Sequence, residues 1–131
     1  MEKDMHLAKR HAISAVFNIT VSNEDIDDIM VAALEGGIAY WCKEAEVVGD
    51  YRGEYASEQI SWDGALRLHD SEDDVVYELT LPKFLNGLRL WIENEHAFEL
   101  TDAGRLDIGQ IDALAADTII QYALFNDVIY G

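Results

Sequence analysis

Two short segments of alternating polarity on either side of an acidic turn constrain the fold more than any other feature. Residues 64–80 read GALRLHD, then SEDD, then VVYELT. With 71–74 as a four-residue loop, the facing pairs are Leu66 with Leu79, Arg67 with Glu78, Leu68 with Tyr77, His69 with Val76, and Asp70 with Val75. The apolar pairs then share one face while opposite charges meet on the other. Because two independent alternations agree, the chain is predicted to form an antiparallel hairpin in this register.

Three further segments carry apolar residues at helical spacing. The first begins after Ser22, an N-cap with Asp25 in the capping-box position and further acids in the first turns. The second begins after Thr80, which we expect to cap a helix with Pro82 in its first turn, and Asp107 is expected to cap the third. The predicted buried stripes are Ile26, Ile29, Met30, Ala33 and Leu34; Leu81, Phe84, Leu85, Leu88, Trp91 and Ile92; and Ile111, Leu114, Ala115, Ile119, Tyr122 and Phe125.

The segments between these elements leave alternatives open. Gly36 and Gly37 either end the first helix or permit close packing within it, and the apolar run 38–42 favours continuation. Residues 15–21 are consistent with a strand, although a helix over 5–18 also fits, and residues 128–130 add a short terminal strand. Residues 47–61 carry glycine breakers and fit no simple pattern, and residues 94–105 read as a polar loop.

The sum is an α+β domain, with a small antiparallel sheet packed against about three amphipathic helices. The sheet consists of the hairpin 64–80 plus one or two further strands. The length of the chain suits a single domain over residues 1–131, with residues 1–14 as a flexible or weakly ordered N-terminal arm.

Composition narrows the class of function. The chain has 26 acidic and 9 basic side chains, a formal charge of −17, yet half of its residues are hydrophobic, so it is not a disordered acidic tail. The first twenty residues carry +1 and the rest −18. Direct binding to nucleic acid is therefore not expected, because it depends on Lys and Arg neutralising phosphates. With one cysteine, no signal-peptide pattern and no apolar run of membrane length, we expect a cytoplasmic protein that does not bind membranes.

Four segments together resemble a known family. They read ALEGGIAYWC at 33–42, VVGDYRGEYASEQIS at 47–61, YELTLPKFLNGLRLWIEN at 77–94 and IDALAADTIIQYALFNDVIYG at 111–131. As a set they resemble a family of small acidic proteins of unassigned activity that phages, prophages and mobile elements of gut bacteria encode, largely in Firmicutes and relatives. The resemblance covers residues 19–93 and 107–131. It implies an accessory phage gene acting in the cytoplasm of a bacterial host, and it carries over no site residue.

The sequence lacks the motifs that are typical of catalysis and metal binding. The four histidines and one cysteine show no metal-ligand spacing, and the acids from Asp70 lack the glycine and the final glutamate of a calcium loop. Cys42 lies among aromatic residues, where a lone cysteine is typically a small core residue. No serine or phosphate-loop signature is present. We therefore expect no catalytic residue, no cofactor and no metal, and hence no enzyme.

The shortage of Lys and Arg relative to Asp and Glu after residue 20 is the main indication of function. It favours an interaction module that binds a protein, in its sharpest form an acidic nucleic-acid mimic that occupies the cationic groove of a host defence protein of the CRISPR or restriction type. The acids expected to contact this basic, nucleic-acid-binding host protein are Glu24, Asp25, Asp27, Asp28, Asp70, Glu72, Asp73 and Asp74, with residues 93–95 as a further group.

A second hypothesis treats the acidity as solubility alone. The chain is then a structural phage accessory domain or one that binds a small ligand. The glycine-punctuated segment 51–62 is the expected ligand or interface segment, with Tyr51, Arg52, Tyr55, Glu58 and Trp62 as its candidate residues. Trp62 is either a lid on the core or an exposed anchor. The two candidate strands at 15–21 and 128–130 also allow a homodimer.

Overall fold

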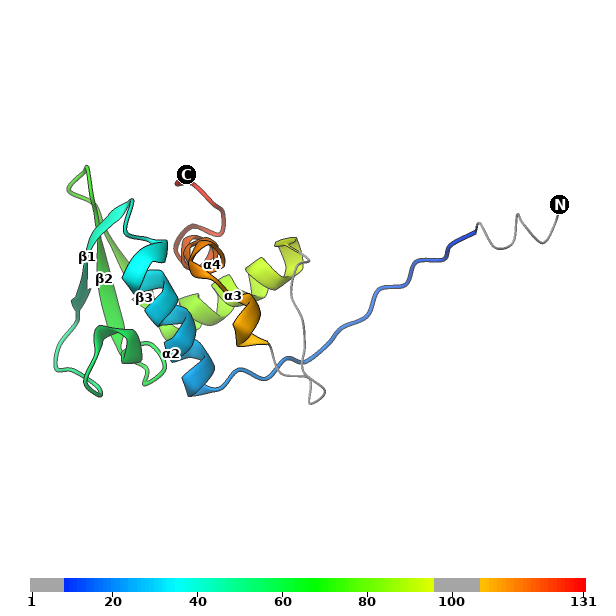
Figure 1. The fold of residues 1–131 in the computed structure, drawn as a ribbon, viewed down its shortest axis with the longest axis horizontal. Helices are drawn as coiled ribbons and strands as arrows, with labels where there is room; N and C mark the ends of the chain where they lie inside the picture. The colour runs from blue at the N-terminus through cyan, green and yellow to red at the C-terminus, as the bar shows by residue number, and fades with distance from the viewer. Residues whose placement is uncertain (1–8, 96–106) are drawn as a thin grey trace.

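Three helices cover one face of a three-stranded antiparallel sheet, and the other face of the sheet is open to solvent (Figure 1). The structure is a computed structural model that describes residues 9–95 and 107–131. The elements in chain order are α2 (Asn23–Ala32), a π-helical turn (Ala33–Gly37), β1 (Cys42–Val47), a 3₁₀ turn (Ala56–Glu58), β2 (Ala65–Asp70), β3 (Val76–Thr80), α3 (Leu81–Glu95), a second 3₁₀ turn (Ile108–Gln110) and α4 (Ala113–Phe125). The predicted α+β class is confirmed.

The predicted hairpin is present in the predicted register. Arg67 faces Glu78 and Leu68 faces Tyr77 across β2 and β3, and the Asp70 amide donates to the Val75 carbonyl at 2.9 Å. Leu66, Leu68 and Leu79 are fully buried under the helices, whereas Arg67 and Glu78 lie on the open face. The alternation of polarity therefore decides which face of the sheet packs against the core.

The third strand is β1, and the two strands predicted at the chain ends are wrong. Over residues 9–21 there is neither helix nor strand, only an isolated β-bridge at Thr20, and residues 126–131 form no strand. β1 instead pairs with β2, with Glu44 opposite His69 and Ala45 opposite Leu68. Its register shifts between Cys42 and Glu44. Such a bulge breaks the alternation of polarity, so the sequence CKEAEV does not read as a strand. Residues 1–8, which belong to the N-terminal segment 1–14 predicted to be flexible, lie outside the described residues.

The start of α2 is confirmed and its end is corrected. The Ser22 hydroxyl accepts from the Asp25 amide at 3.0 Å, and the Asp25 carboxylate accepts from the Ser22 amide at 3.0 Å. The helix does not continue to residue 42, because it closes in the π-helical turn that ends at Gly37. A Cβ at Gly37 would lie 2.6 Å from the Ala113 carbonyl, so α4 approaches here as close as backbone allows.

Helices α3 and α4 pack against each other along most of their length. Helix α3 begins directly after Thr80, with Pro82 in its first turn, and buries Phe84, Leu88 and Trp91. Asp107 caps only the 3₁₀ turn that precedes α4, while Asp112 caps α4 itself by accepting from the Ala115 amide at 2.8 Å.

The predicted stripe of α4 is only partly correct. Leu114 is 74 % exposed, whereas Asp117 and Gln121 are almost fully buried. α4 lies between α2, α3 and the π-helical turn, so nearly every side of it after the first turn is interior. Residues 96–106, which include most of the predicted polar loop, lie outside the described residues. None of the described helices has the length and apolarity needed to cross a membrane.

Candidate functional site

The solvent-facing side of α2 is a row of carboxylates. Glu24 and Asp28 are exposed and lie four residues apart, which places them about 5–6 Å from each other on one helix face. Asp27 is half-buried beside them, and Glu35 extends the exposed row beyond the helix. No basic residue occurs between Ser22 and Glu35, so this stretch of the chain carries no counter-charge of its own.

Asp25 does not belong to this row. Its side chain is 8 % exposed and serves the capping box at the start of α2. A carboxylate held in this way stabilises the helix start and offers little to a partner. Of the four acids predicted at this helix, Glu24, Asp27 and Asp28 remain as surface candidates.

A side-chain hydrogen bond joins the acidic helix to the segment 51–62. The Ser61 hydroxyl donates to the Asp27 carboxylate at 2.5 Å and lies 3.3 Å from the Glu58 carbonyl. Loop 48–64 therefore lies beside the first turns of α2, as Figure 1 also shows. We call the row of α2 carboxylates together with Tyr51, Glu54, Tyr55, Trp62 and Asp63 of this loop the α2–loop surface.

Loop 48–64 is held in one conformation by two of its own side chains. Gln59, which is 1 % exposed, donates to the carbonyls of Arg52 at 2.7 Å and Tyr55 at 2.9 Å, and it accepts from the Arg52 amide at 2.8 Å. The Glu58 carboxylate accepts from the amides of Glu54 and Tyr55. Gly53 has φ +76°, the left-handed region that favours glycine. A loop organised before binding loses less conformational entropy when a partner docks.

The fixed loop exposes aromatic side chains. Tyr51, Tyr55 and Trp62 are 60 %, 64 % and 58 % exposed, so Trp62 is an exposed side chain and not a lid on the core. The Arg52 guanidinium donates to the Trp62 carbonyl at 3.0 Å and ties the two ends of the loop together. Exposed Tyr and Trp beside carboxylates form a surface that suits Arg and Lys, because aromatic faces attract cations and carboxylates pair with them.

The other predicted acidic group lies at the opposite end of the molecule. Glu72, Asp73 and Asp74 are exposed in the loop between β2 and β3, far from the start of α2 (Figure 1). Asp70 is 5 % exposed and organises this turn by accepting from the amides of Glu72 and Asp73, both at 2.8 Å, and from the Tyr130 hydroxyl at 2.5 Å. The hydrogen bond from Tyr130, followed by those from the two amides, lowers the pKa of the Asp70 carboxyl.

We predict that Asp70→Asn lowers the melting temperature at neutral pH and that its deficit shrinks in acid. A carboxyl whose pKa is lowered by folding stabilises the protein above its unfolded pKa, and this contribution is lost as pH falls through the folded pKa. Thermal unfolding from pH 7 down to pH 3 measures the effect, with the exposed Asp73→Asn as the matched control. A deficit that stays constant over this range would contradict the role given to Asp70.

The interior contains a network of polar side chains that was not predicted from the sequence. The Asp117 carboxylate accepts from the Trp41 indole at 2.8 Å, from the Tyr40 hydroxyl at 2.7 Å and from Gln121 at 3.0 Å. Gln121 in turn accepts from the amides of residues 129 and 130 at 2.8 Å, and the Tyr130 ring stacks on Trp41 at 4.6 Å. Burial and the bond to Asp117 raise the pKa of Tyr40 to about 12.

This network serves the fold, because it pins the C-terminal segment to the core. Every buried side-chain nitrogen or oxygen of the described residues has a hydrogen-bond partner, so the network presents no unsatisfied group to a ligand. The only sequence signal for it is Asp117 followed four residues later by Gln121 within an otherwise apolar helix. Cys42 is buried as predicted, and burial raises the pKa of its thiol, which disfavours the reactive thiolate.

Two further features bear on ligand binding. A hollow of about 530 Å³ lies between the two ends of loop 48–64 and the end of β3, with Asp50, Tyr51, Arg52, Asp63 and Thr80 in its wall. Over residues 9–95 and 107–131, no three His, Cys, Asp or Glu side chains converge as metal ligands would.

The structure thus brings together two groups that the sequence placed in separate hypotheses. The acids of α2 lie beside segment 51–62, which carries the exposed aromatic residues, whereas the acids of residues 72–74 lie in the loop between β2 and β3. Comparison of the chain with family models, with curated proteins and with solved structures gives no match. Function is therefore argued from the surface itself.

Proposed function

We propose that this chain is a non-enzymatic interaction protein that binds a basic protein through the α2–loop surface. The observation that carries the proposal is the hydrogen bond between Ser61 and Asp27, which places the carboxylates of α2 beside a loop with three exposed aromatic side chains. Aromatic side chains and charged partners of Arg dominate the binding energy of protein interfaces. Carboxylates and aromatic faces together match a partner rich in Arg and Lys.

The partner class proposed is a nucleic-acid-binding protein. Such proteins carry the densest clusters of exposed Arg and Lys, arranged to hold phosphates. Carboxylates on one helix face, with no base among them, present a comparable row of negative charge. The resemblance to small acidic phage proteins supports a host defence protein as the target, which the chain occupies in place of its nucleic acid.

Two variants of equal charge test where the partner binds. The site-neutral variant combines Glu24→Gln, Asp28→Asn and Glu54→Gln; the tip-neutral variant combines Glu72→Gln, Asp73→Asn and Asp74→Asn. All six residues are exposed, and each variant removes three of the 26 acids. Affinity capture from the lysate of a bacterial host, followed by mass spectrometry, is expected to recover a basic nucleic-acid-binding protein with the wild type and the tip-neutral variant and to lose it with the site-neutral variant.

Equal recovery by the two variants would mean that net charge alone attracts the captured protein, which contradicts the proposal. Recovery should also fall steeply as salt shortens the Debye length from about 10 Å at 0.1 M to about 3 Å at 1 M. A captured protein that lacks a basic surface would contradict the proposal as well.

The hollow beside Arg52 supports a second candidate function. Its volume of about 530 Å³ lies within the range of small-molecule sites, and both charged and aromatic side chains line it. On this alternative the chain binds a small metabolite and the acids serve solubility. A thermal-shift screen against nucleotides, sugars and amino acids separates the two, because only the ligand function predicts a rise in melting temperature.

A further inference from the structure

The N-terminal segment carries large apolar side chains into solvent. Residues 9–21, which we call the arm, pass beside α3, where Ile19 and Val21 are half-buried against the core, and the earlier residues extend away from the body (Figure 1). Ile13, Val16 and Phe17 are 91 %, 97 % and 72 % exposed. Three large apolar side chains so close together on one exposed segment indicate a surface that another molecule covers.

The arm also forms one wall of an apolar groove. The groove has a volume of about 680 Å³ and lies between residues 15–21 of the arm and the outer side of α3, where Leu85, Leu88 and Ile92 form the second wall. Leu85 is 42 % exposed although it belongs to the apolar stripe of α3. The groove is therefore an extension of the core that this part of the chain leaves uncovered.

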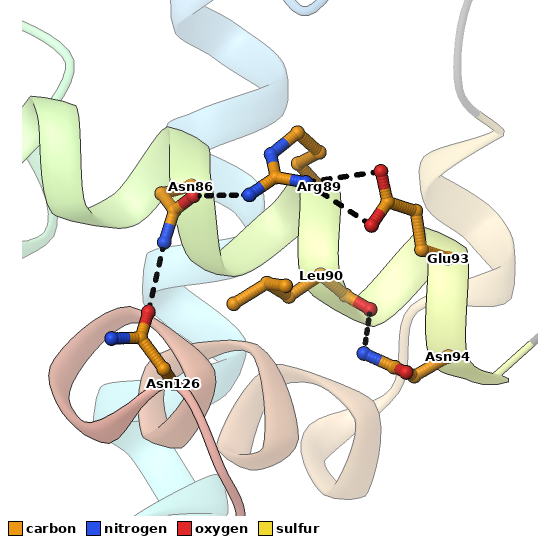
Figure 2. Close-up of polar contacts among 6 residues, drawn as sticks. All are labelled: Asn86, Arg89, Leu90, Glu93, Asn94 and Asn126. Carbon is orange, nitrogen blue, oxygen red and sulfur yellow. Dashed lines mark hydrogen bonds and ion pairs between the residues drawn. The ribbon is translucent and has the colours of Figure 1, made fainter. Parts of the chain in front are cut away.

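The polar rim of the groove is already satisfied. The Arg89 guanidinium donates to the Glu93 carboxylate at 3.0 and 3.1 Å and to the Asn86 side chain at 2.7 Å (Figure 2). Asn86 donates in turn to Asn126 at the end of α4, at 3.1 Å. Because Arg89 and Glu93 pair with each other, the rim offers no strong charge to a partner and the apolar walls decide what binds.

Charge identifies the occupant as a second copy of this chain. The arm carries Lys9 and Arg10 and no acid, whereas residues after 20 carry a net charge of −18. An arm that reaches another copy therefore brings apolar side chains to an apolar groove and positive charge to an acidic body. Groove and arm are adjacent on the same chain, so one two-fold axis lets each copy give an arm and receive one.

We propose that two copies of the chain associate by exchanging their arms, with Val16 and Phe17 of each copy packed against Leu85, Leu88 and Ile92 of the other. This interface lies apart from loop 48–64. It goes beyond the proposed function and does not depend on it.

Molar mass measured by light scattering over a concentration series of the full chain tests the exchange. We expect the wild type to approach twice 14.7 kDa. The double variant Val16→Asp, Phe17→Asp should dimerise at least about a hundredfold more weakly, because each copy then fails to bury two large apolar side chains. The double variant Val128→Asp, Ile129→Asp is the control of equal charge: both residues are exposed on the C-terminal segment, at 40 % and 55 %, and dimerisation should change by less than about threefold.

Complementation separates exchange from other modes of association. Leu85→Asp disrupts the groove and leaves the arm intact, whereas Val16→Asp, Phe17→Asp disrupts the arm and leaves the groove intact. A dimer of either variant alone therefore contains no intact arm bound in an intact groove. In a mixture, the intact arm of Leu85→Asp can bind the intact groove of the arm variant, so one of the two arm–groove contacts is restored and dimer should be recovered. A wild type that stays at 14.7 kDa at every concentration, arm variants that dimerise like the wild type, or mixing without recovery would each overturn the proposal. The dimer should weaken yet persist at 1 M salt, because the charge of the arm favours the acidic partner and the apolar walls supply most of the affinity. Complete loss of dimer at 1 M salt would mean that charge pairing alone holds the two copies and would contradict the proposal.

Discussion

Asp117→Ala is expected to lower the free energy of unfolding by about 3 kcal/mol. The Asp117 carboxylate is 3 % exposed and accepts hydrogen bonds from Trp41, Tyr40 and Gln121. Truncation leaves the buried Trp41 indole N–H without its acceptor, removes the acceptor that orders Tyr40 and Gln121, and opens a cavity beside the Trp41 ring. Chemical denaturation followed by Trp fluorescence measures the loss.

Asp117→Asn is the matched control, because it keeps the shape of the side chain and one acceptor oxygen. Its loss should be smaller than that of Asp117→Ala. A stability of Asp117→Ala within about 1 kcal/mol of the wild type would mean that the network contributes little, and would contradict its role in pinning the C-terminal segment.

Gly87→Ala is expected to lower the free energy of unfolding by about 3 kcal/mol. A Cβ at this position would lie 2.6 Å from both the Ala123 nitrogen and the Ile119 carbonyl oxygen of α4. Backbone atoms cannot turn aside as a side chain can, so α3 and α4 must separate. The same denaturation experiment measures the cost.

Gly36→Ala serves as the control for the glycine substitution. Nothing lies within 4 Å of a Cβ added at Gly36, and the alanine reduces the freedom of the unfolded chain. We expect a change between zero and about 1 kcal/mol in the stabilising direction. Equal losses at Gly36 and Gly87 would contradict the close approach of the two helices.

Alternation of polarity and helix capping act between residues close in the sequence, and they were sufficient to predict the hairpin and the start of α2. The hairpin register follows from alternation within fifteen residues, and the start of α2 follows from Ser22 and Asp25, three positions apart. β1 could not be found in this way, because a bulge at residues 42–44 breaks its alternation and its outward positions carry acids. The apolar residues of the arm favoured a strand, yet no neighbouring strand pairs with residues 9–19.

The candidate site shows the same division. The acids of α2 and the aromatic segment were each visible in the sequence, but the bond that joins them links residues 34 positions apart. Sequence position also could not distinguish acids that serve the fold from acids that face solvent. Asp70 and Asp117 look like their neighbours in the sequence, yet both are buried and hydrogen-bonded, and Asp25, which the sequence already placed in the capping box, was still counted among the contact acids.

This distinction changes the meaning of the net charge. Part of the −17 belongs to caps and turns, where carboxylates stabilise helix starts and a hairpin loop. The exposed remainder is unevenly placed: one group lies at the hairpin loop, and another borders the rigid aromatic loop. Only the second combines charge, exposed aromatic area and a fixed conformation, which is why we assign binding to it.

Displacement of nucleic acid from the captured partner tests the central claim most directly. Labelled duplex DNA bound to the purified partner is titrated with wild type, tip-neutral and site-neutral protein at one fixed salt concentration. The account predicts displacement by the wild type, tip-neutral protein within about threefold of it, and site-neutral protein weaker by about tenfold or more. Equal displacement by the two variants, or a complex in which DNA and this protein bind the partner together, would contradict it.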